Sequence, residues 1–358
     1  MKIPGRPTLA DVAARAGVSL KTASRALNGE YGVAQATAER VLRASKDLGF
    51  RPNHLARSLA SRRPSAAVGL VVSSVADPFF AALAGAVEEV LAPRDLQLVI
   101  ASHGDDENRQ RRIIRTLIER RVDALLLVPA PGDCGHLRRE VDLGLVVTGL
   151  DRPPTGLEVD TVTVDNCAGA FEATRRFLRA GHRRIAFLAN DSRLWTIQQR
   201  HDGYLSALRE SGVTCDPTLI HQNCSDAAAS ERVVARMLRL PHPPTALFAA
   251  QHLIGRGAIR ALLGVTDPPA MASMDEIADT DLLALRPFVV ESGPVRMGRA
   301  AASMALERLD GLTGQARAVV LPPFFRNVED DLRSNRGPGM PATSRMPVSS
   351  PLTQSERS

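Results

Sequence analysis

The side chains best suited to a specific chemistry stand together near the start of the chain. Leu20, Lys21 and Arg25 follow a Gly-Val-Ser turn, and the two basic residues are spaced one helical turn apart. Lysine and arginine donate to the O6 and N7 acceptors of guanine, and a leucine suits a thymine methyl group. These residues therefore predict the reading of base edges in a DNA major groove.

Three short helices are predicted to carry these side chains. The first covers residues 8–15, where Thr8 and Asp11 have the spacing of a capping box. The second covers residues 20–27 and the third covers residues 35–48. Two helices joined by a short Ala-Gly-Val-Ser turn are typical of a helix-turn-helix, whose second helix enters the major groove. The positions of the third helix expected to face inward are Val41, Leu42, Ala44, Ser45 and Leu48.

The charge distribution supports the same interpretation. The chain has a net charge of +6, but residues 1–63 hold 12 lysines and arginines against 4 acidic residues, so the remainder is slightly acidic. A basic domain of this kind attracts the phosphate backbone. Short polar side chains and helix N-termini can also hold phosphates. The candidates for such contacts are Thr8, Thr22, Ser24 and Asn28.

The sequence lacks the signals that are typical of several other classes of protein. The four cysteines form no Cys-x-x-Cys pair, and the histidines form no His-x-x-x-His pair, so no metal site is expected. The sequence has no Gly-x-Ser-x-Gly nucleophile elbow. Neither a catalytic residue nor a cofactor is therefore expected. No apolar run is long enough for a membrane span, and the N-terminus does not resemble a signal peptide. The expectation is a non-enzyme of the cytoplasm that acts at the nucleoid.

A different pattern begins at Ala66. Short apolar runs alternate with amphipathic segments of helical length, which predicts parallel sheets covered on both faces. Roughly ten such strands are more than one open sheet usually holds, so two doubly wound halves are expected. A ligand cleft is expected between the strand ends of the two halves. The tail is rich in Ser, Pro and Gly, and is expected to be disordered. The predicted units are a DNA-binding domain over 1–52, a short helix and linker over 53–65, a core over 66–331 and the tail over 332–358.

These motifs together resemble the lactose-repressor family of bacterial regulators. The match runs from Thr8 to Asn28, continues through 48–59, and extends across the core to about Asp330. The resemblance implies an α/β core like that of periplasmic binding proteins, with an N-subdomain over 66–163 plus 293–320 and a C-subdomain over 164–292 plus 321–331. It also implies a homodimer, a near-palindromic operator and a small-molecule effector. The implied function is that of a repressor of a carbohydrate uptake or catabolism operon.

The segment 53–60 corresponds to the hinge helix of that family. A helix this short is only marginally stable alone, because isolated helices below about 12 residues rarely persist. The resemblance implies that paired hinge helices fold on DNA and wedge Leu59 into the minor groove, which kinks the duplex. The other residues expected beside the groove are Asn53, Ala56 and Arg57.

Several core residues resemble the family's effector contacts because they stand at predicted strand ends. Arg200 has a fork of donors for a hydroxyl pair or a carboxylate, and Trp195 beside it could stack on a sugar ring. Taken singly, the same residues could be helix caps, a surface ion pair or core. The remaining candidates are Asp77, Phe79, Phe80, Asp165 and Asp275.

One pair departs from the family pattern. Gln251 and His252 occupy the place of a frequent Asn-Asp pair. The change removes a carboxylate acceptor and adds a titratable donor, which suggests an effector with acidic groups, such as a sugar acid. Drift without functional consequence explains the pair equally well.

Three alternatives stay open at this point. A transcription activator of the same fold differs only in where its operator lies relative to the promoter. A solute-binding protein would share the core but lack the basic N-terminal domain, and a sugar-modifying enzyme would need a catalytic pair in the cleft. The sequence identifies neither the effector nor whether its binding releases DNA or promotes DNA binding.

Overall fold

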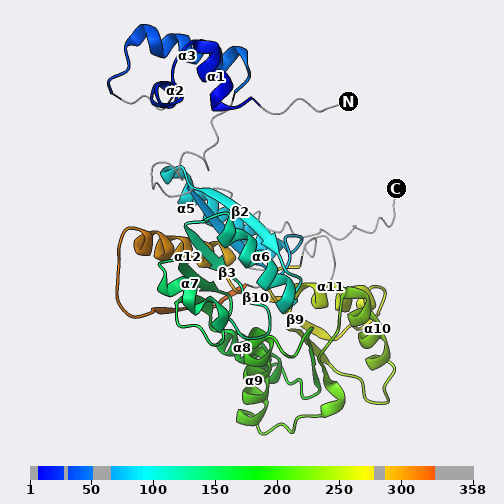
Figure 1. Cartoon of the computed structure of the whole chain (residues 1–358). Helices are drawn as coiled ribbons and strands as arrows, with labels where there is room; N and C mark the ends of the chain where they lie inside the picture. Colours follow the sequence, from blue (N-terminus) through cyan, green and yellow to red (C-terminus); the bar gives the residue numbers. More distant parts are fainter. Residues whose placement is uncertain (1–6, 28–30, 51–65, 278–286, 327–358) are drawn as a thin grey trace, which may run out of the picture.

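The computed structural model describes residues 7–27, 31–50, 66–277 and 287–326. The predicted hinge helix over 53–60 and the tail over 332–358 lie outside these residues. The described part begins with three helices, α1 (Leu9–Ala16), α2 (Leu20–Leu27) and α3 (Gln35–Asp47), drawn in blue in Figure 1. Their shared core is built on small and branched side chains, including Val12, Ala23 and Val41.

The first helix is bounded as its sequence predicts. The backbone N–H of Thr8 donates to Asp11 Oδ2 at 2.7 Å, and the N–H of Asp11 donates to Thr8 Oγ1 at 3.3 Å, so the capping box is confirmed. Gly17 ends α1 with a φ of 62°, a left-handed conformation that suits glycine. One inward prediction for α3 is wrong, because Leu42 is 54% exposed. It follows Val41 directly and therefore lies about 100° around the helix from the buried stripe.

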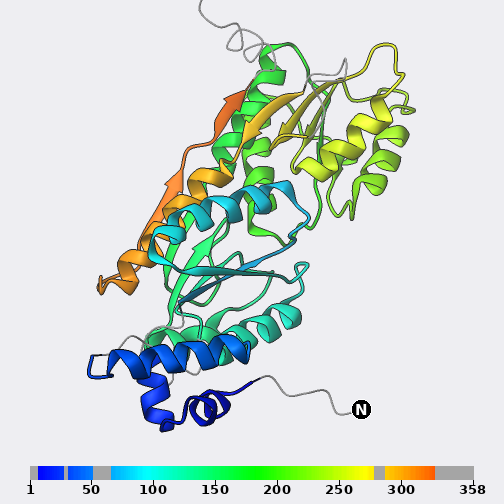
Figure 2. The ribbon, with the colours of Figure 1, turned by 90° about the horizontal axis from the view of Figure 1, so that it is seen from above.

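The N-subdomain is a six-stranded parallel sheet in the order β11-β5-β4-β3-β1-β2. On β1, Val68, Leu70 and Val72 face one core, whereas Val71 faces the other. Helices α5 and α12 cover the first face and lie side by side in Figure 2, and α6 and α7 cover the second. The bounds are β1 (Ala67–Val72), α5 (Pro78–Leu91), β2 (Gln97–Ser102), α6 (Glu107–Glu119), β3 (Ala124–Leu127), α7 (Arg138–Asp142), β4 (Val146–Leu150), β5 (Asp160–Val164), α12 (Pro294–Leu309) and β11 (Ala318–Leu321).

The C-subdomain repeats this architecture with the strand order β12-β10-β9-β8-β6-β7. Helices α8 and α9 cover one face of its sheet, and α10 and α11 cover the other. The bounds are α8 (Asn166–Arg179), β6 (Ile185–Leu188), α9 (Trp195–Glu210), β7 (Ile220–His221), α10 (Ala227–Met237), β8 (Ala246–Ala249), α11 (His252–Leu262), β9 (Ala270–Met274), β10 (Phe288–Glu291) and β12 (Phe324–Arg326). Short 3₁₀ turns complete the described elements at Ala92–Arg94, Gly135–Leu137 and Pro217–Leu219.

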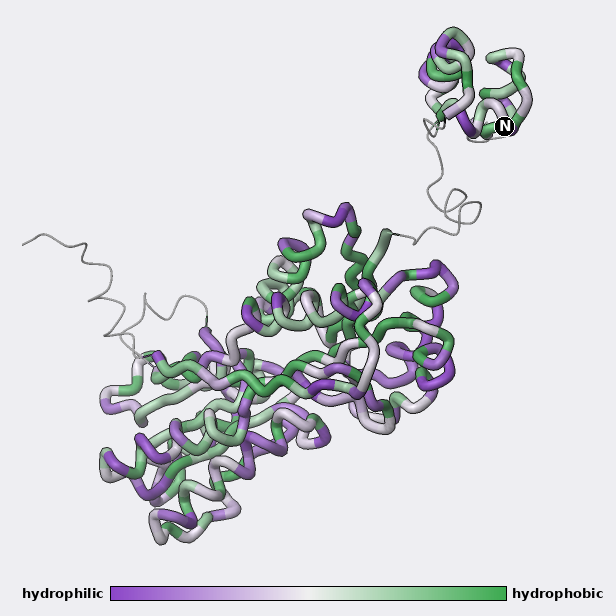
Figure 3. The backbone as a smooth tube through the Cα atoms, turned by 90° about the vertical axis from the view of Figure 1, so that its left-hand side faces the viewer, coloured by the Kyte–Doolittle hydropathy of each residue, from purple (hydrophilic) through white to green (hydrophobic). Residues whose placement is uncertain are grey.

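The predicted fold class, two doubly wound α/β halves behind a helix-turn-helix, is confirmed. Figure 3 shows hydrophobic residues concentrated along the strands through the middle of the core and hydrophilic ones in the outer helices and loops. One detail differs from the expected all-parallel arrangement, since β12 pairs antiparallel with β10. The chain passes between the subdomains after β5, after β10 and after β11. These crossovers are the segments about which the two halves can move relative to each other.

A close helix contact in the C-subdomain gives a first prediction. A Cβ atom at Gly203 on α9 would lie 2.2 Å from the carbonyl oxygen of Cys167 on α8, so Gly203→Ala must push the two helices apart. We expect a loss of about 1–3 kcal/mol of stability, measured by thermal unfolding. Gly85→Ala is the matched control, because a Cβ there meets nothing within 4 Å. That helical substitution is expected to stabilise by up to about 1 kcal/mol, so similar losses in both variants would contradict the packing account.

A buried ion cluster ties three elements of the N-subdomain together. Asp160 at the start of β5 is 3% exposed, and its carboxylate accepts from Arg308 Nη2 at 2.7 Å and from Arg317 Nη2 at 2.6 Å. Burial raises the pKa of Asp160, but the hydrogen bonds from Arg308 and Arg317 outweigh that effect and hold the pKa below its usual range. Because the folded pKa is depressed, this stabilisation is complete above about pH 4 and is lost as the pH falls through the folded pKa.

Asp160→Asn is therefore expected to cost about 3–5 kcal/mol at pH 7, because it leaves two guanidinium groups without their shared carboxylate. Below about pH 4, the free energy of unfolding of the variant should also fall less steeply with acidification than that of the parent protein. Asp310→Asn is the control, since its bidentate pair with Arg94 is about half exposed and should contribute little to stability. Equal losses in chemical unfolding of the two variants would show that burial is not what makes the Asp160 cluster stabilising.

Candidate DNA-reading helix and ligand cleft

The second helix presents two of the predicted base-reading side chains to the outside. Ser19 Oγ accepts from the backbone N–H of Thr22 at 3.1 Å and so starts α2 directly after the turn at Gly17. Ala23 and Ala26 face the domain core and fix the rotation of the helix. Leu20 is consequently 54% exposed, and Lys21 is also exposed. Both side chains therefore lie exposed in the first turn of α2, the part of a recognition helix that carries base contacts.

The other predicted DNA contacts are less uniform. Arg25 is half-buried, and its Nη2 donates to the backbone oxygen of Tyr31 at 2.5 Å. This side chain therefore supports the backbone at Tyr31, a role that its sequence position did not predict. Thr8 and Thr22 are engaged in the capping contacts of α1 and α2, and Ser24 is half-buried. The predicted contacts that lie outside the described residues are Asn28, Asn53, Ala56, Arg57 and Leu59.

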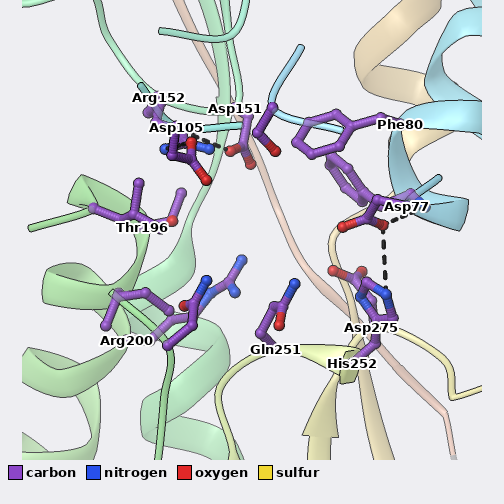
Figure 4. A pocket seen from close by; sticks show the side chains of 15 residues that line it. Asp77, Phe80, Asp105, Asp151, Arg152, Thr196, Arg200, Gln251, His252 and Asp275 are labelled. Atoms are coloured by element: carbon purple, nitrogen blue, oxygen red, sulfur yellow. Dashed lines mark hydrogen bonds and ion pairs between the residues drawn. The ribbon is translucent and has the colours of Figure 1, made fainter. Parts of the chain in front are cut away.

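A cleft opens between the two subdomains, at the carboxyl ends of their parallel strands. Figure 4 shows side chains from both subdomains pointing into it. The N-subdomain contributes Ser73, Asp77, Phe79, Phe80, Asp105, Asp151 and Arg152. The C-subdomain contributes Asn190, Leu194, Thr196, Ile197, Arg200, Gln251, His252 and Asp275.

The structure brings together seven of the nine residues predicted for an effector site. These are Asp77, Phe79, Phe80, Arg200, Gln251, His252 and Asp275. Asp165 does not line the cleft; its carboxylate caps α8 by accepting from the N–H of Ala168 at 2.8 Å. Trp195 is half-buried and also lies outside the lining, because the first turn of α9 directs Leu194, Thr196 and Ile197 to the cleft instead.

Several lining residues missed in the sequence follow the same rule as those that were found. Asp105 follows β2, Asp151 and Arg152 follow β4, and Asn190 follows β6. Each stands just beyond the carboxyl end of a strand, where ligand contacts gather in open α/β sheets. A systematic search of residues that follow predicted strands would have found them.

Asp77 and His252 meet across the cleft. Asp77 caps α5 through its Oδ1, which accepts from the N–H of Phe79 at 2.9 Å. His252 begins α11, and its Nε2 lies 3.5 Å from the same oxygen, as drawn in Figure 4. Burial raises the pKa of Asp77, and the nearby His252 and the Phe79 amide oppose this rise. The pair joins the two subdomains at one corner of the cleft.

Arg200 is held at the floor of the cleft and is 5% exposed. Its Nε donates to Asn166 Oδ1 at 2.7 Å, and its Nη1 donates to the backbone oxygen of Ala250 at 2.5 Å. These two contacts fix the plane of the guanidinium group.

Asp275 faces the same region from the end of β9. Its two carboxylate oxygens accept from the N–H and the hydroxyl of Ser292 at 2.8 and 3.1 Å. Burial raises the pKa of Asp275, opposed first by Arg200 and then by Ser292. The cleft thus offers fixed donors and acceptors suited to a polar ligand.

Comparison with known proteins decides the identity of this arrangement. The model described as the sugar-binding domain of the LacI family and periplasmic binding proteins matches residues 65–324. The model described as bacterial regulatory proteins of the lacI family matches residues 8–53. The chain belongs to the lacI family. It is therefore a DNA-binding transcription regulator, as the helix-turn-helix predicted.

Individual lacI-family relatives match over nearly their full length. The regulator CelR of Thermobifida fusca is 34% identical over 331 residues, which cover 88% of this chain and 96% of CelR. The ribose operon repressor of Haemophilus influenzae is 29% identical over 88% of this chain and 96% of the repressor. The solved complex of CelR with cellobiose has a TM-score of 0.63 at 31% identity, and covers 90% of this chain and 98% of that structure.

In the ranges that the structure describes, no helix is long and apolar enough to cross a membrane. No group of three or more His, Cys, Asp or Glu side chains suited to a metal ion occurs in those ranges.

Proposed function

We propose that this lacI-family regulator is a homodimeric repressor of a carbohydrate uptake or catabolism operon. A sugar effector controls it, either by releasing the repressor from its operator or by promoting operator binding. The observation that carries the proposal is the cleft itself. Its polar side chains come from both subdomains and stand at strand ends behind a helix-turn-helix. The relatives support a sugar effector, since they include a ribose operon repressor and a CelR–cellobiose complex.

The proposed effector contacts are the predicted residues that line the cleft. Asp77, Phe79 and Phe80 belong to the N-subdomain, and the C-subdomain holds Arg200, Gln251, His252 and Asp275. A ligand that touches residues of both subdomains makes different contacts when the subdomains are open and when they are closed. Its binding can therefore shift the population between the open and closed states. The crossovers after β5, β10 and β11 convert that shift into a rotation of the subdomains. In a dimer, this rotation changes the spacing of the two DNA-binding domains and so the affinity for a near-palindromic operator.

The proposed role is regulatory and includes no catalysis. The polar groups deepest in the cleft are already engaged in structural contacts, since Arg200 donates to Asn166 and Asp275 accepts from Ser292. The named relatives are transcription regulators. The place of action that follows from binding an operator is the cytoplasm, at the chromosome.

The test is a search for the operator with the full chain. Genomic fragments that the protein retains are sequenced, and binding is then measured by fluorescence anisotropy with and without sugars. We expect a site with two-fold symmetry, two chains per site, and an affinity that one sugar changes. Retention of all fragments in proportion to their length, with no preferred site, would contradict the proposed function.

A further inference from the structure

Two of the three crossovers between the subdomains run side by side. The second crossover, residues 292–293, joins β10 to α12, and the third crossover, residues 322–323, joins β11 to β12. They are neighbours because β10 pairs with β12, so that Glu291 at the end of one strand lies opposite Phe324 at the start of the other. A side-chain contact between these crossovers therefore acts where the subdomains turn relative to each other.

One side chain of α12 contacts both crossovers. Arg296 stands in the first turn of this helix, and its Nη2 donates to the backbone oxygen of Pro322 at 2.8 Å. The guanidinium carbon of Arg296 lies 3.6 Å from the ring centroid of Phe324, which is a cation–π distance. The same group lies back over the second crossover, because a Cβ atom at Gly293 would be 3.0 Å from both Arg296 Nε and Nη2. We call the contacts of Arg296 with Pro322 and Phe324 the Arg296 clamp.

The Arg296 clamp is not part of the packed core. Phe324 is 48% exposed and belongs to none of the buried clusters of the two subdomains. Arg296 Nε is buried, and it has no hydrogen-bond partner in the part of the chain that the structure describes. A buried donor without an acceptor costs free energy, which offsets part of what the clamp contributes. The clamp therefore stabilises this arrangement of the crossovers by a small margin, as a reversible movement requires.

The second crossover also reaches the ligand cleft. Ser292 is fully buried, and its N–H and hydroxyl donate to the two carboxylate oxygens of Asp275 at 2.8 and 3.1 Å. Asp275 lines the cleft, where Figure 4 labels it. Residues 292–296 thus connect a carboxylate of the cleft directly to the Arg296 clamp. A change at Asp275 can be transmitted along this short segment to both crossovers.

We propose that Arg296 is a positioning residue of the regulatory switch, whose clamp sets the ratio between the arrangement of the subdomains in this structure and the alternative one. In this arrangement the subdomains meet across the cleft, since His252 Nε2 lies 3.5 Å from Asp77 Oδ1. Release of the clamp lets the two crossovers turn independently, so the population moves away from this arrangement. The proposal rests on the proposed function only for the response to operator and effector.

The first test measures the distance between the subdomains without DNA or effector. Spin labels are carried by an unnatural amino acid at Leu143 and Glu210, which are exposed and belong to different subdomains. Labelled chains are mixed with an excess of unlabelled chains, so that double electron–electron resonance records distances within one chain. We expect one dominant distance in the parent protein and a second distance in Arg296→Ala and Phe324→Ala. The ratio of the two populations should change at least about 5-fold, because a cation–π contact or hydrogen bond is lost. The same distribution in the parent and in both variants would overturn the proposal.

Arg299→Ala is the matched control for Arg296→Ala. Arg299 stands on the same helix, but it is exposed and pairs with Glu89 of α5 instead of a crossover. Its variant should keep the distance distribution of the parent, and a shift as large as that of Arg296→Ala would contradict the clamp. Arg296→Lys keeps the positive charge but loses the planar group, and should behave like Arg296→Ala. Phe324→Ala removes a half-exposed ring, so it decides the question if thermal unfolding shows that Arg296→Ala is poorly folded.

A double variant tests whether the two side chains act as one contact. Arg296→Ala already removes the cation–π contact, so adding Phe324→Ala should shift the population ratio no further. Additive shifts would show that the two side chains act separately, and would overturn the clamp.

The second test connects the clamp to regulation. Fluorescence anisotropy gives the operator affinity with and without saturating effector for Arg296→Ala and for Arg299→Ala. Neither residue lines the cleft, and both lie outside the DNA-binding domain, so neither variant changes a ligand or DNA contact. We expect Arg296→Ala to change the ratio of the two operator affinities at least about 3-fold, whereas Arg299→Ala keeps the ratio of the parent.

The two tests separate this proposal from the proposed function. A shifted distance distribution with an unchanged affinity ratio in Arg296→Ala would overturn the role of the clamp in switching and leave the regulator intact. The lack of any preferred operator or responding sugar would contradict the proposed function, and the distance measurement would still decide whether Arg296 holds the subdomains in this arrangement.

Discussion

Replacing Leu20 and Lys21 together by alanine is expected to weaken operator binding at least about 30-fold, because each lost base contact costs about 1–3 kcal/mol. Both side chains are exposed, and neither belongs to the core of the three-helix domain, so the fold should persist. Binding to unrelated DNA should fall much less, since base contacts rather than phosphate contacts are removed. Fluorescence anisotropy with the operator and with a scrambled duplex measures both effects.

The chain offers a closely matched control for this experiment. Leu42 on α3 has the same 54% exposure as Leu20, and Lys46 on the same helix is exposed like Lys21. Leu42→Ala with Lys46→Ala therefore removes the same side chains and the same charge from a different helix. We expect only the modest, sequence-independent loss that follows from one fewer positive charge. An equal loss in the two double variants would show that α2 is not the recognition helix.

Replacing Arg200 by glutamine is expected to abolish the response to the effector while operator binding is kept. Arg200 is buried, and its donors are oriented by Asn166 and Ala250. Removing one partner of a buried charged hydrogen bond costs about 2–5 kcal/mol, which corresponds to a loss of effector affinity of at least about 30-fold. Calorimetry measures the affinity, and anisotropy with saturating effector measures the response.

Two further variants define what the Arg200 experiment shows. Arg200→Lys keeps the positive charge but loses the planar guanidinium group. A loss of effector affinity as large as that of Arg200→Gln would show that the geometry of the guanidinium group, not its charge, is required. Arg193→Gln changes an exposed arginine of the neighbouring loop and should respond normally. If Arg200→Gln bound the effector normally, the proposed site would be misplaced, and a loss of operator binding in the absence of effector would indicate unfolding instead.

The sequence predicted the local elements of the DNA-binding domain well because their signals are local. The capping box at Thr8 and Asp11 and the turn at Gly17 involve residues only a few positions apart. Leu42 was assigned to the wrong face because its apolar side chain was read without the helical phase set by Val41. Apolar character alone does not show which way a helical side chain points.

The strands of the core show a similar limit. Buried apolar runs such as β1 and β8 were predicted directly from their composition. The runs that form β7, β11 and β12 were not singled out, because these strands are only partly buried. Such edge strands are defined by pairing with distant segments, which composition does not reveal.

The cleft was partly predictable from strand ends, which located seven of the predicted effector contacts. Trp195 and Asp165 do not line the cleft, because their direction depends on how α9 and α8 begin. Arg152 was missed because its significance comes from Asp105, a residue 47 positions away. Long-range pairs of this kind arise only once the order of the sheet is known.

The most direct test of the central claim, an operator-binding regulator switched through its cleft, is a closed thermodynamic cycle. Operator affinity is measured with and without saturating effector, and effector affinity is measured with and without saturating operator. Linkage requires both affinities to change by the same factor, expected to be about 5–150-fold. The account predicts two equal factors in that range for the full chain. Operator affinity that stays the same at saturating effector would contradict it.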